Sequence, residues 1–153
     1  MIPKILVSIF VAFIIATLDI RTEEDRMKNL KIGMVAPDFT LMGDDGQKHK
    51  ISQHLGKKNV VLAFYPKDFT FVCPTEIVEF ANLNQEFMDR DCIVLGGSTD
   101  NEFCKLAWRR EHPDLKSLNQ WSFSDTQGTL VDALGIRSEE GVAYRATFII
   151  DPH

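Results

Sequence analysis

The sequence has 153 residues, of which 44% are hydrophobic and 10% aromatic, as is typical of one globular domain with a sizeable core. Its 22 acidic and 17 basic residues give a formal net charge of −5 and form no basic patch with interleaved aromatics, which argues against nucleic-acid binding. Three cysteines without a Cys-x-x-Cys pair or a His/Cys cluster argue against a disulfide scaffold and a zinc site. They favour a reducing compartment, so we expect a cytoplasmic protein.

The first 26 residues differ from the rest of the chain. Residues 5–18 form an uncharged apolar run of 14 residues. The run is shorter than the roughly 20 residues that cross a bilayer, but it has the length of a signal-peptide core. Three interpretations stay open: an upstream extension or misassigned start, an export or membrane-anchor segment, and a buried helix. We therefore divide the chain into an apolar extension, residues 1–26, and a domain, residues 27–153.

Within the domain, strand-like apolar runs alternate with helical periodicity. We expect first an extended segment at 35–41, a hairpin turn at 43–46 and a central strand at 60–65. A helix from 74 to about 90, a buried strand at 92–96 and a helix capped by Asp100 or Asn101 and stopped by Pro113 follow. The last elements are a short strand or loop at 121–125, a short helix at 129–134 closed by Gly135, and a buried strand at 146–150. Strands separated by helices predict an α/β sheet with helices on its faces.

The sequence stops three residues after the last predicted strand. No further strand or helix follows to cover that side of the sheet. An uncovered apolar face with an open edge invites association, so we expect either a partner there or an incomplete chain.

The run from Phe64 to Glu76, Phe-Tyr-Pro-Lys-Asp-Phe-Thr-Phe-Val-Cys-Pro-Thr-Glu, carries the strongest functional signal. The chain leaves a predicted strand, breaks at Pro66 and starts a helix at Cys73. A helix N-terminus has unpaired N–H groups and a dipole that favours negative charge, so it stabilises a thiolate over a thiol. Pro74 suits the first helical position, and Glu76 the position of a capping-box carboxylate. We predict a reactive cysteine at position 73.

A thiolate that attacks a polarised bond needs a group that orients the bond and positive charge where negative charge develops. The hydroxyl of Thr70, three residues before Cys73, can donate to or accept from a substrate oxygen, and Pro66 can shape the loop and shield the sulfur. Arg145, at the start of the last predicted strand, is our candidate for the positive charge, and Glu76 can hold it in a bidentate pair. This set suits attack on a peroxide O–O bond, which would convert Cys73 to a sulfenic acid.

With these residues the sequence resembles the peroxiredoxins, and within them the alkyl hydroperoxide reductase C type of typical two-cysteine enzyme. Three segments carry the likeness, which runs from about residue 30 to residue 152: Pro66-x-x-x-Thr70-x-x-Cys73, Ala-Pro-Asp-Phe at 36–39, and Arg-Ala-Thr-Phe-Ile-Ile-Asp at 145–151. The resemblance implies a thioredoxin-like α/β fold with a central mixed sheet flanked by helices. It also implies that Cys73 is the peroxidatic cysteine, that Thr70, Pro66 and Arg145 complete its site, and that Glu76 supports the arginine.

The resemblance further implies an enzyme of antioxidant defence and redox homeostasis. It would reduce hydrogen peroxide and organic hydroperoxides through a cysteine sulfenic acid, with no metal or organic cofactor. The implied partners are a thioredoxin-like or flavoprotein reductant and further copies of the chain, in a homodimer or a ring.

Two features depart from the family pattern, and they leave other functions open. Typical two-cysteine members carry a resolving cysteine beyond a final strand and helix, so we expect a C-terminally truncated chain that lacks both. Cys92 and Cys104 do not occupy that place, and we interpret them as packing residues. The apolar N-terminus is the second departure. A non-catalytic redox-sensing or holdase-like binding protein is therefore the alternative function.

The remaining motifs point to structural roles. A thioredoxin-type disulfide reductase is disfavoured because residues 73–76 read Cys-Pro-Thr-Glu, without a second cysteine. The four histidines show no ligand spacing, and we interpret them as surface or turn residues. We interpret Trp108 and Trp121 as core or subunit-contact residues, and residues 109–111 as a solvated helix face.

Overall fold

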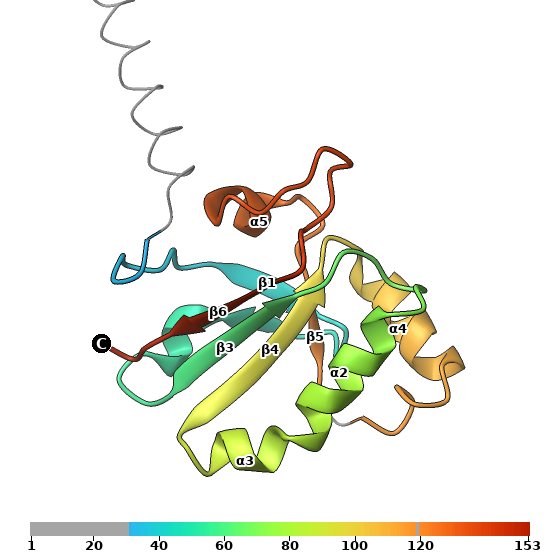
Figure 1. Ribbon diagram of the computed structural model, residues 1–153, viewed down its shortest axis with the longest axis horizontal. Coiled ribbons are helices and arrows are strands. Elements are labelled where there is room, and N and C mark those ends of the chain that lie inside the picture. The colour runs from blue at the N-terminus through green and yellow to red at the C-terminus, as the bar shows by residue number, and fades with distance from the viewer. Residues whose placement is uncertain (1–30, 119) are drawn as a thin grey trace, which may run out of the picture. The chain divides into compact units, whose positions relative to one another are not determined.

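The computed structural model describes residues 31–118 and 120–153 (Figure 1), and the predictions for residues 1–26 lie outside this part. Its elements are, in chain order, β1 (Thr40–Gly43), β2 (Lys48–Lys50), the 3-10 helix η1 (Ile51–His54), β3 (Asn59–Phe64), α2 (Cys73–Asn82), α3 (Asn84–Met88), β4 (Cys92–Ser98), α4 (Glu102–Glu111), β5 (Ser122–Ser124), α5 (Thr129–Ala133) and β6 (Ala146–Ile150). Among the described residues, no helix is both long enough and apolar enough to span a membrane.

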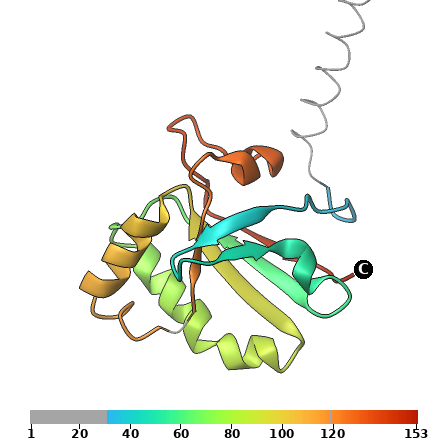
Figure 2. The same ribbon diagram turned by 180° about the vertical axis from the view of Figure 1, so that it is seen from behind.

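The strands form one mixed sheet in the order β2-β1-β5-β4-β3-β6. β3, β4 and β5 run parallel, whereas β6 is antiparallel to β3, and β1 is antiparallel to both β2 and β5. Parallel neighbours need a crossover, which α2 and α3 supply between β3 and β4, and α4 between β4 and β5. The view from behind shows the β1–β2 hairpin in cyan, with its turn where the sequence predicts it (Figure 2). The predicted α/β sheet is confirmed.

Both faces of β3 are buried, which explains why its apolar run is continuous rather than alternating. Its even-numbered side chains enter the larger core, which meets β4, β5 and α5 and includes Val60, Leu62, Phe64, Leu95, Phe123, Leu130 and Val131. A smaller core lies with α2 and α4 and consists of Tyr65, Cys73, Trp108 and Leu115. The end of β3 and the residue after it therefore reach both cores, and the chain leaves the sheet there toward Cys73.

Three elements differ from the sequence predictions. The helix predicted to run to about residue 90 is two helices, because Leu83 leaves the helical region at φ −87° and ψ 1° between α2 and α3. β6 was predicted to be buried, but its side chains alternate. Ala146, Phe148 and Ile150 pack on the larger core, whereas Thr147 and Ile149 on the opposite face belong to neither core and are exposed, Ile149 to 75%. The extended segment predicted from residue 35 becomes a strand only at Thr40.

Candidate active site

Cys73 is the first residue of α2 and follows the loop of residues 65–72 that leaves β3. Its side chain is only 2% exposed and packs in the smaller core with Tyr65, Trp108 and Leu115. Pro74 therefore occupies the second helical position rather than the first, still within the turn whose N–H groups have no helical partner. The thiol lies at a helix N-terminus, as the sequence predicts, and is shielded from solvent.

Arg145 reaches Cys73 from the segment just before β6, 72 residues further along the chain. Its Nη2 donates to the Cys73 sulfur at 3.5 Å, and its Nη1 pairs with the carboxylate of Glu76. The register of β6 against β3 explains this approach, because Ala146 lies opposite Phe64 and Arg145 is the residue just before Ala146. The structure therefore brings together three of the predicted residues: Cys73, Glu76 and Arg145.

The Arg145 guanidinium has two partners, the Cys73 sulfur and the Glu76 carboxylate. The hydrogen bond with Cys73 is the largest influence that raises the pKa of Arg145, and the negative charge of Glu76 raises it further. The Glu76 carboxylate is engaged with the guanidinium, and α2 has no side-chain hydrogen bond at its N-cap, Val72. The capping box predicted for Glu76 is therefore wrong, because the ion pair with Arg145 takes its carboxylate instead.

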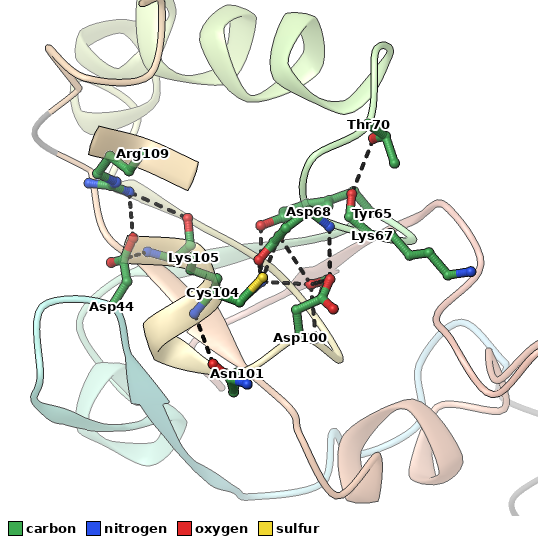
Figure 3. A network of polar contacts seen from close by, with 12 residues as sticks. Asp44, Tyr65, Lys67, Asp68, Thr70, Asp100, Asn101, Cys104, Lys105 and Arg109 are labelled. Carbon is green, nitrogen blue, oxygen red and sulfur yellow. Dashed lines mark hydrogen bonds and ion pairs between the residues drawn. The ribbon is translucent and has the colours of Figure 1, made fainter. Parts of the chain in front are cut away.

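Thr70 and Pro66 both lie in the loop before Cys73, and among the described residues neither makes a hydrogen bond with its sulfur. The Thr70 hydroxyl donates to the carbonyl oxygen of Lys67 at 3.1 Å, a bond within the loop (Figure 3). Pro66 is half-buried and starts the loop directly after Tyr65. The Thr70 hydroxyl, predicted to serve a substrate oxygen, is engaged in this bond within the loop.

A buried polar network next to the site was missed by the sequence analysis (Figure 3). Lys105 of α4 is 2% exposed, and its Nζ donates to Ser98 Oγ at 2.6 Å, Tyr65 Oη at 3.0 Å and Asp68 Oδ1 at 3.2 Å. Asp68 belongs to the loop between β3 and Cys73. The available signal was the spacing of Lys105 and Trp108, which places both on one face of the helix, but a lysine at such a position is normally read as exposed.

Burial is the largest influence on the pKa of Asp68, of Lys105 and of Tyr65. It raises the pKa of Asp68 and lowers that of Lys105, and in both cases the ion pair between them opposes the change. It also raises the pKa of Tyr65 well above 10, helped by the charge of Asp68. Tyr65 therefore stays protonated and accepts a hydrogen bond from Lys105.

Arg109 and His49 lie in surroundings that differ from their predicted ones. Arg109 does not belong to a solvated face, because it pairs with Asp44 at 3.0 Å and its side chain is only 19% exposed. His49 is not a simple surface residue, since its ring stacks on Trp121 with centroids 3.5 Å apart. The three cysteines are free, and Cys92 and Cys104 are both half-buried. Within residues 31–118 and 120–153, no group of three or more His, Cys, Asp or Glu side chains could hold a metal ion.

Comparisons with known proteins agree on one family. The AhpC/TSA family matches residues 32–153. Over 93 residues the chain is 54% identical to the alkyl hydroperoxide reductase C of Mycolicibacterium smegmatis, a match that covers 61% of this chain and 48% of the relative. It is 45% identical to peroxiredoxin-2 of Pongo abelii over 130 residues, which cover 80% of this chain and 73% of the relative. The match thus spans about half the length of the first of these relatives.

Solved structures show the same likeness. The structure of Mycobacterium tuberculosis AhpC superposes with a TM-score of 0.73 at 43% identity, covering 80% of this chain and 77% of that one. This likeness and the observed mixed sheet confirm the thioredoxin-like fold that the sequence resemblance implied.

Proposed function

The chain belongs to the AhpC/TSA family of peroxiredoxins, and we propose that it is a thiol-dependent peroxidase that reduces hydrogen peroxide and organic hydroperoxides. The observation that carries this proposal is the hydrogen bond from Arg145 to the Cys73 sulfur at a helix N-terminus. A guanidinium and a helix dipole both favour a thiolate over a thiol. A shielded sulfur in such surroundings is suited to nucleophilic attack.

The proposed reaction transfers one oxygen to sulfur. The Cys73 thiolate attacks one peroxide oxygen, an S–O bond forms and the O–O bond breaks, which leaves a sulfenic acid. The sulfur is oxidised by two electrons and the peroxide is reduced by two. The departing hydroxide or alkoxide takes up the proton that the thiol lost on ionisation and leaves as water or alcohol.

Arg145 is proposed to stabilise the charge that moves onto the leaving oxygen. It has further donors beyond the one directed at Cys73, and a planar guanidinium can bond sulfur and oxygen together. Glu76 would hold the guanidinium in place through their ion pair. Pro66 would keep water from the sulfur, and Thr70 would act on the substrate if its hydroxyl turned from Lys67 when peroxide binds.

The catalytic cycle would also need a reductant. We propose that a thiol resolves the sulfenic acid and that a thioredoxin-like protein or a flavoprotein reductase restores Cys73. We further propose that the protein works as a homodimer or a larger ring, as its family resemblance implies.

The test is a single-turnover reaction with hydrogen peroxide, with the sulfenic acid at Cys73 trapped and measured by mass spectrometry. We expect the wild type to react far faster than free glutathione and Cys73→Ser to consume no peroxide. Cys92→Ser is the matched control and should leave the rate unchanged. Wild-type reactivity equal to that of glutathione, or a fully active Cys73→Ser protein, would end the proposal.

Exposed apolar side chains favour a second candidate, the redox-sensing or holdase-like binding protein. Phe69, Phe71 and Val72 are all exposed on the loop before Cys73. Such a surface can bind apolar segments of other proteins. Loss of the Cys73 thiol with peroxide, without turnover when an external dithiol is supplied, would support this candidate; sustained turnover would support the enzyme.

A further inference from the structure

The loop of residues 65–72 is anchored to the domain through Asp68, although its neighbours on both sides face solvent. Lys67 and Phe69 are exposed, whereas the Asp68 side chain is 1% exposed. The backbone N–H of Asp68 donates to Asp100 Oδ2 at 2.8 Å, and its carboxylate accepts from Lys105 Nζ at 3.2 Å. Both the main chain and the side chain of one loop residue are therefore fixed by the segment that begins α4.

Lys105 connects Asp68 to Tyr65, which packs beside Cys73. Its Nζ donates to Tyr65 Oη at 3.0 Å and lies 4.8 Å from the centre of the Tyr65 ring. Tyr65 packs in the same small core as Cys73. Lys105 thus holds one residue at the start of the loop and one in its middle, and both positions determine where the chain delivers Cys73.

The loop also contains a strained residue that needs such an anchor. Phe69, the residue after Asp68, has φ 55°, a left-handed conformation that costs a residue with a Cβ free energy. Such conformations persist only where the surroundings over-determine them, and they concentrate at functional sites. The Phe69 ring lies against Trp108 of α4, with ring centroids 6.0 Å apart, so α4 holds both Asp68 and its strained neighbour.

The chemistry of the network favours positioning over stability. Removing a lysine and a carboxylate from water costs much of what their attraction returns, so a buried ion pair contributes little net stability. Its directional bonds do, however, select one arrangement of the groups it joins. Here the joined elements are the loop before Cys73, the end of β4 at Ser98 and the helix α4.

We propose that Lys105 is a positioning residue that, through Asp68 and Tyr65, holds the loop so that the Cys73 sulfur stays buried and within reach of Arg145. The proposal rests on the proposed peroxidase function. Lys105 itself is not expected to touch the peroxide. Without it, the loop should relax, Cys73 should become accessible, and the alignment of sulfur and guanidinium should be lost.

The test compares two reactions of Cys73 in the full chain. In Lys105→Met, the second-order rate with hydrogen peroxide should fall by about tenfold to a hundredfold, because a misplacement of about 1 Å costs that much. The rate of Cys73 modification by iodoacetamide should rise by about tenfold, because the sulfur is no longer buried. Unfolding of the whole domain would change both rates in the same directions, so the alkylation of Cys92 must be followed alongside that of Cys73.

Two internal controls sharpen the comparison. Arg109→Met removes another cation of α4, half-buried and one turn away, which pairs with Asp44 rather than with the loop. This variant should keep both Cys73 rates within about twofold of the wild type, since it leaves the reacting groups in place. Cys92, mapped in the same alkylation experiment, reports on opening of the whole domain.

A second variant keeps the proposal testable if Lys105→Met does not fold. Asp68→Asn/Lys105→Met leaves no unpaired buried charge and should therefore be better tolerated, yet it should lose the peroxide rate in the same way. Wild-type peroxide and iodoacetamide rates in either folded variant would overturn the proposal, as would equal acceleration at Cys92 and Cys73. A wild type no faster with peroxide than glutathione would refute the peroxidase alone, while the iodoacetamide contrast would still test the positioning.

Discussion

Replacing Arg145 by leucine tests the charge that faces the Cys73 sulfur. Leucine removes the donor 3.5 Å from the sulfur and leaves the Glu76 carboxylate without its partner. Loss of one preorganised donor to developing negative charge costs about 10²–10³ in rate. Because the Arg145 side chain is 39% exposed and water screens part of its field, we expect the lower end, about 100-fold, or about 2.7 kcal/mol of activation free energy.

Stopped-flow mixing of the reduced protein with hydrogen peroxide provides the assay, followed by the fluorescence of Trp108, which packs beside Cys73. Arg137→Leu is the matched control, because Arg137 also pairs with a carboxylate, Asp132, but on a segment that does not contact the sulfur. It should react at the wild-type rate. An Arg145→Leu protein within about threefold of the wild type would refute the role assigned to the guanidinium.

Two further predictions concern stability. The hydrogen bond from Arg137 lowers the pKa of Asp132 in the folded protein. The ionised carboxylate therefore stabilises the fold above its unfolded pKa, near 3.8. This contribution is lost as the pH falls through the lower pKa of the folded protein. Asp132→Asn should reduce the urea-unfolding free energy by less than about 1 kcal/mol at pH 7, and an equal reduction at a pH below the folded pKa would contradict the linkage. The Asn101 side chain accepts from Cys104 N at the start of α4, so Asn101→Ala should cost about 1 kcal/mol in the same assay, whereas Asn101→Asp should keep most of the stability.

Local patterns predicted most of the sheet. β3 and β4 are apolar runs bounded by polar residues and turns, and the structure places both within one or two residues of the prediction. The cap of α4, predicted at Asp100 or Asn101 and found at Asn101, and the end of α5 before Gly135 follow from single residues with strong local preferences. The exposed face of β6 was missed, because its apolar sequence does not reveal that one face of the strand packs on neither core.

The candidate active site also combines residues that the sequence could identify with contacts that it could not. Cys73 at the start of a helix follows from the chain on either side of it, so the sequence was sufficient to single it out. Glu76 lies one turn further along the same helix, but its partner could not be decided locally: a capping role and a pair with Arg145 were both compatible with its position. The structure shows the ion pair with Arg145.

By itself the sequence determined the α/β alternation, the turns and a cysteine at a helix N-terminus, because each of these depends on neighbours within a few residues. The sequence nominated neighbours for that cysteine, Arg145 among them, but only the tertiary structure decided which of them contact it. The pairing of β6 with β3 carries Arg145 to the sulfur across 72 residues, and the packing of α4 buries Lys105 against Asp68 across 37. Such contacts depend on which elements become neighbours in the sheet, and a lysine or an arginine bears no local mark of the carboxylate or sulfur it will meet.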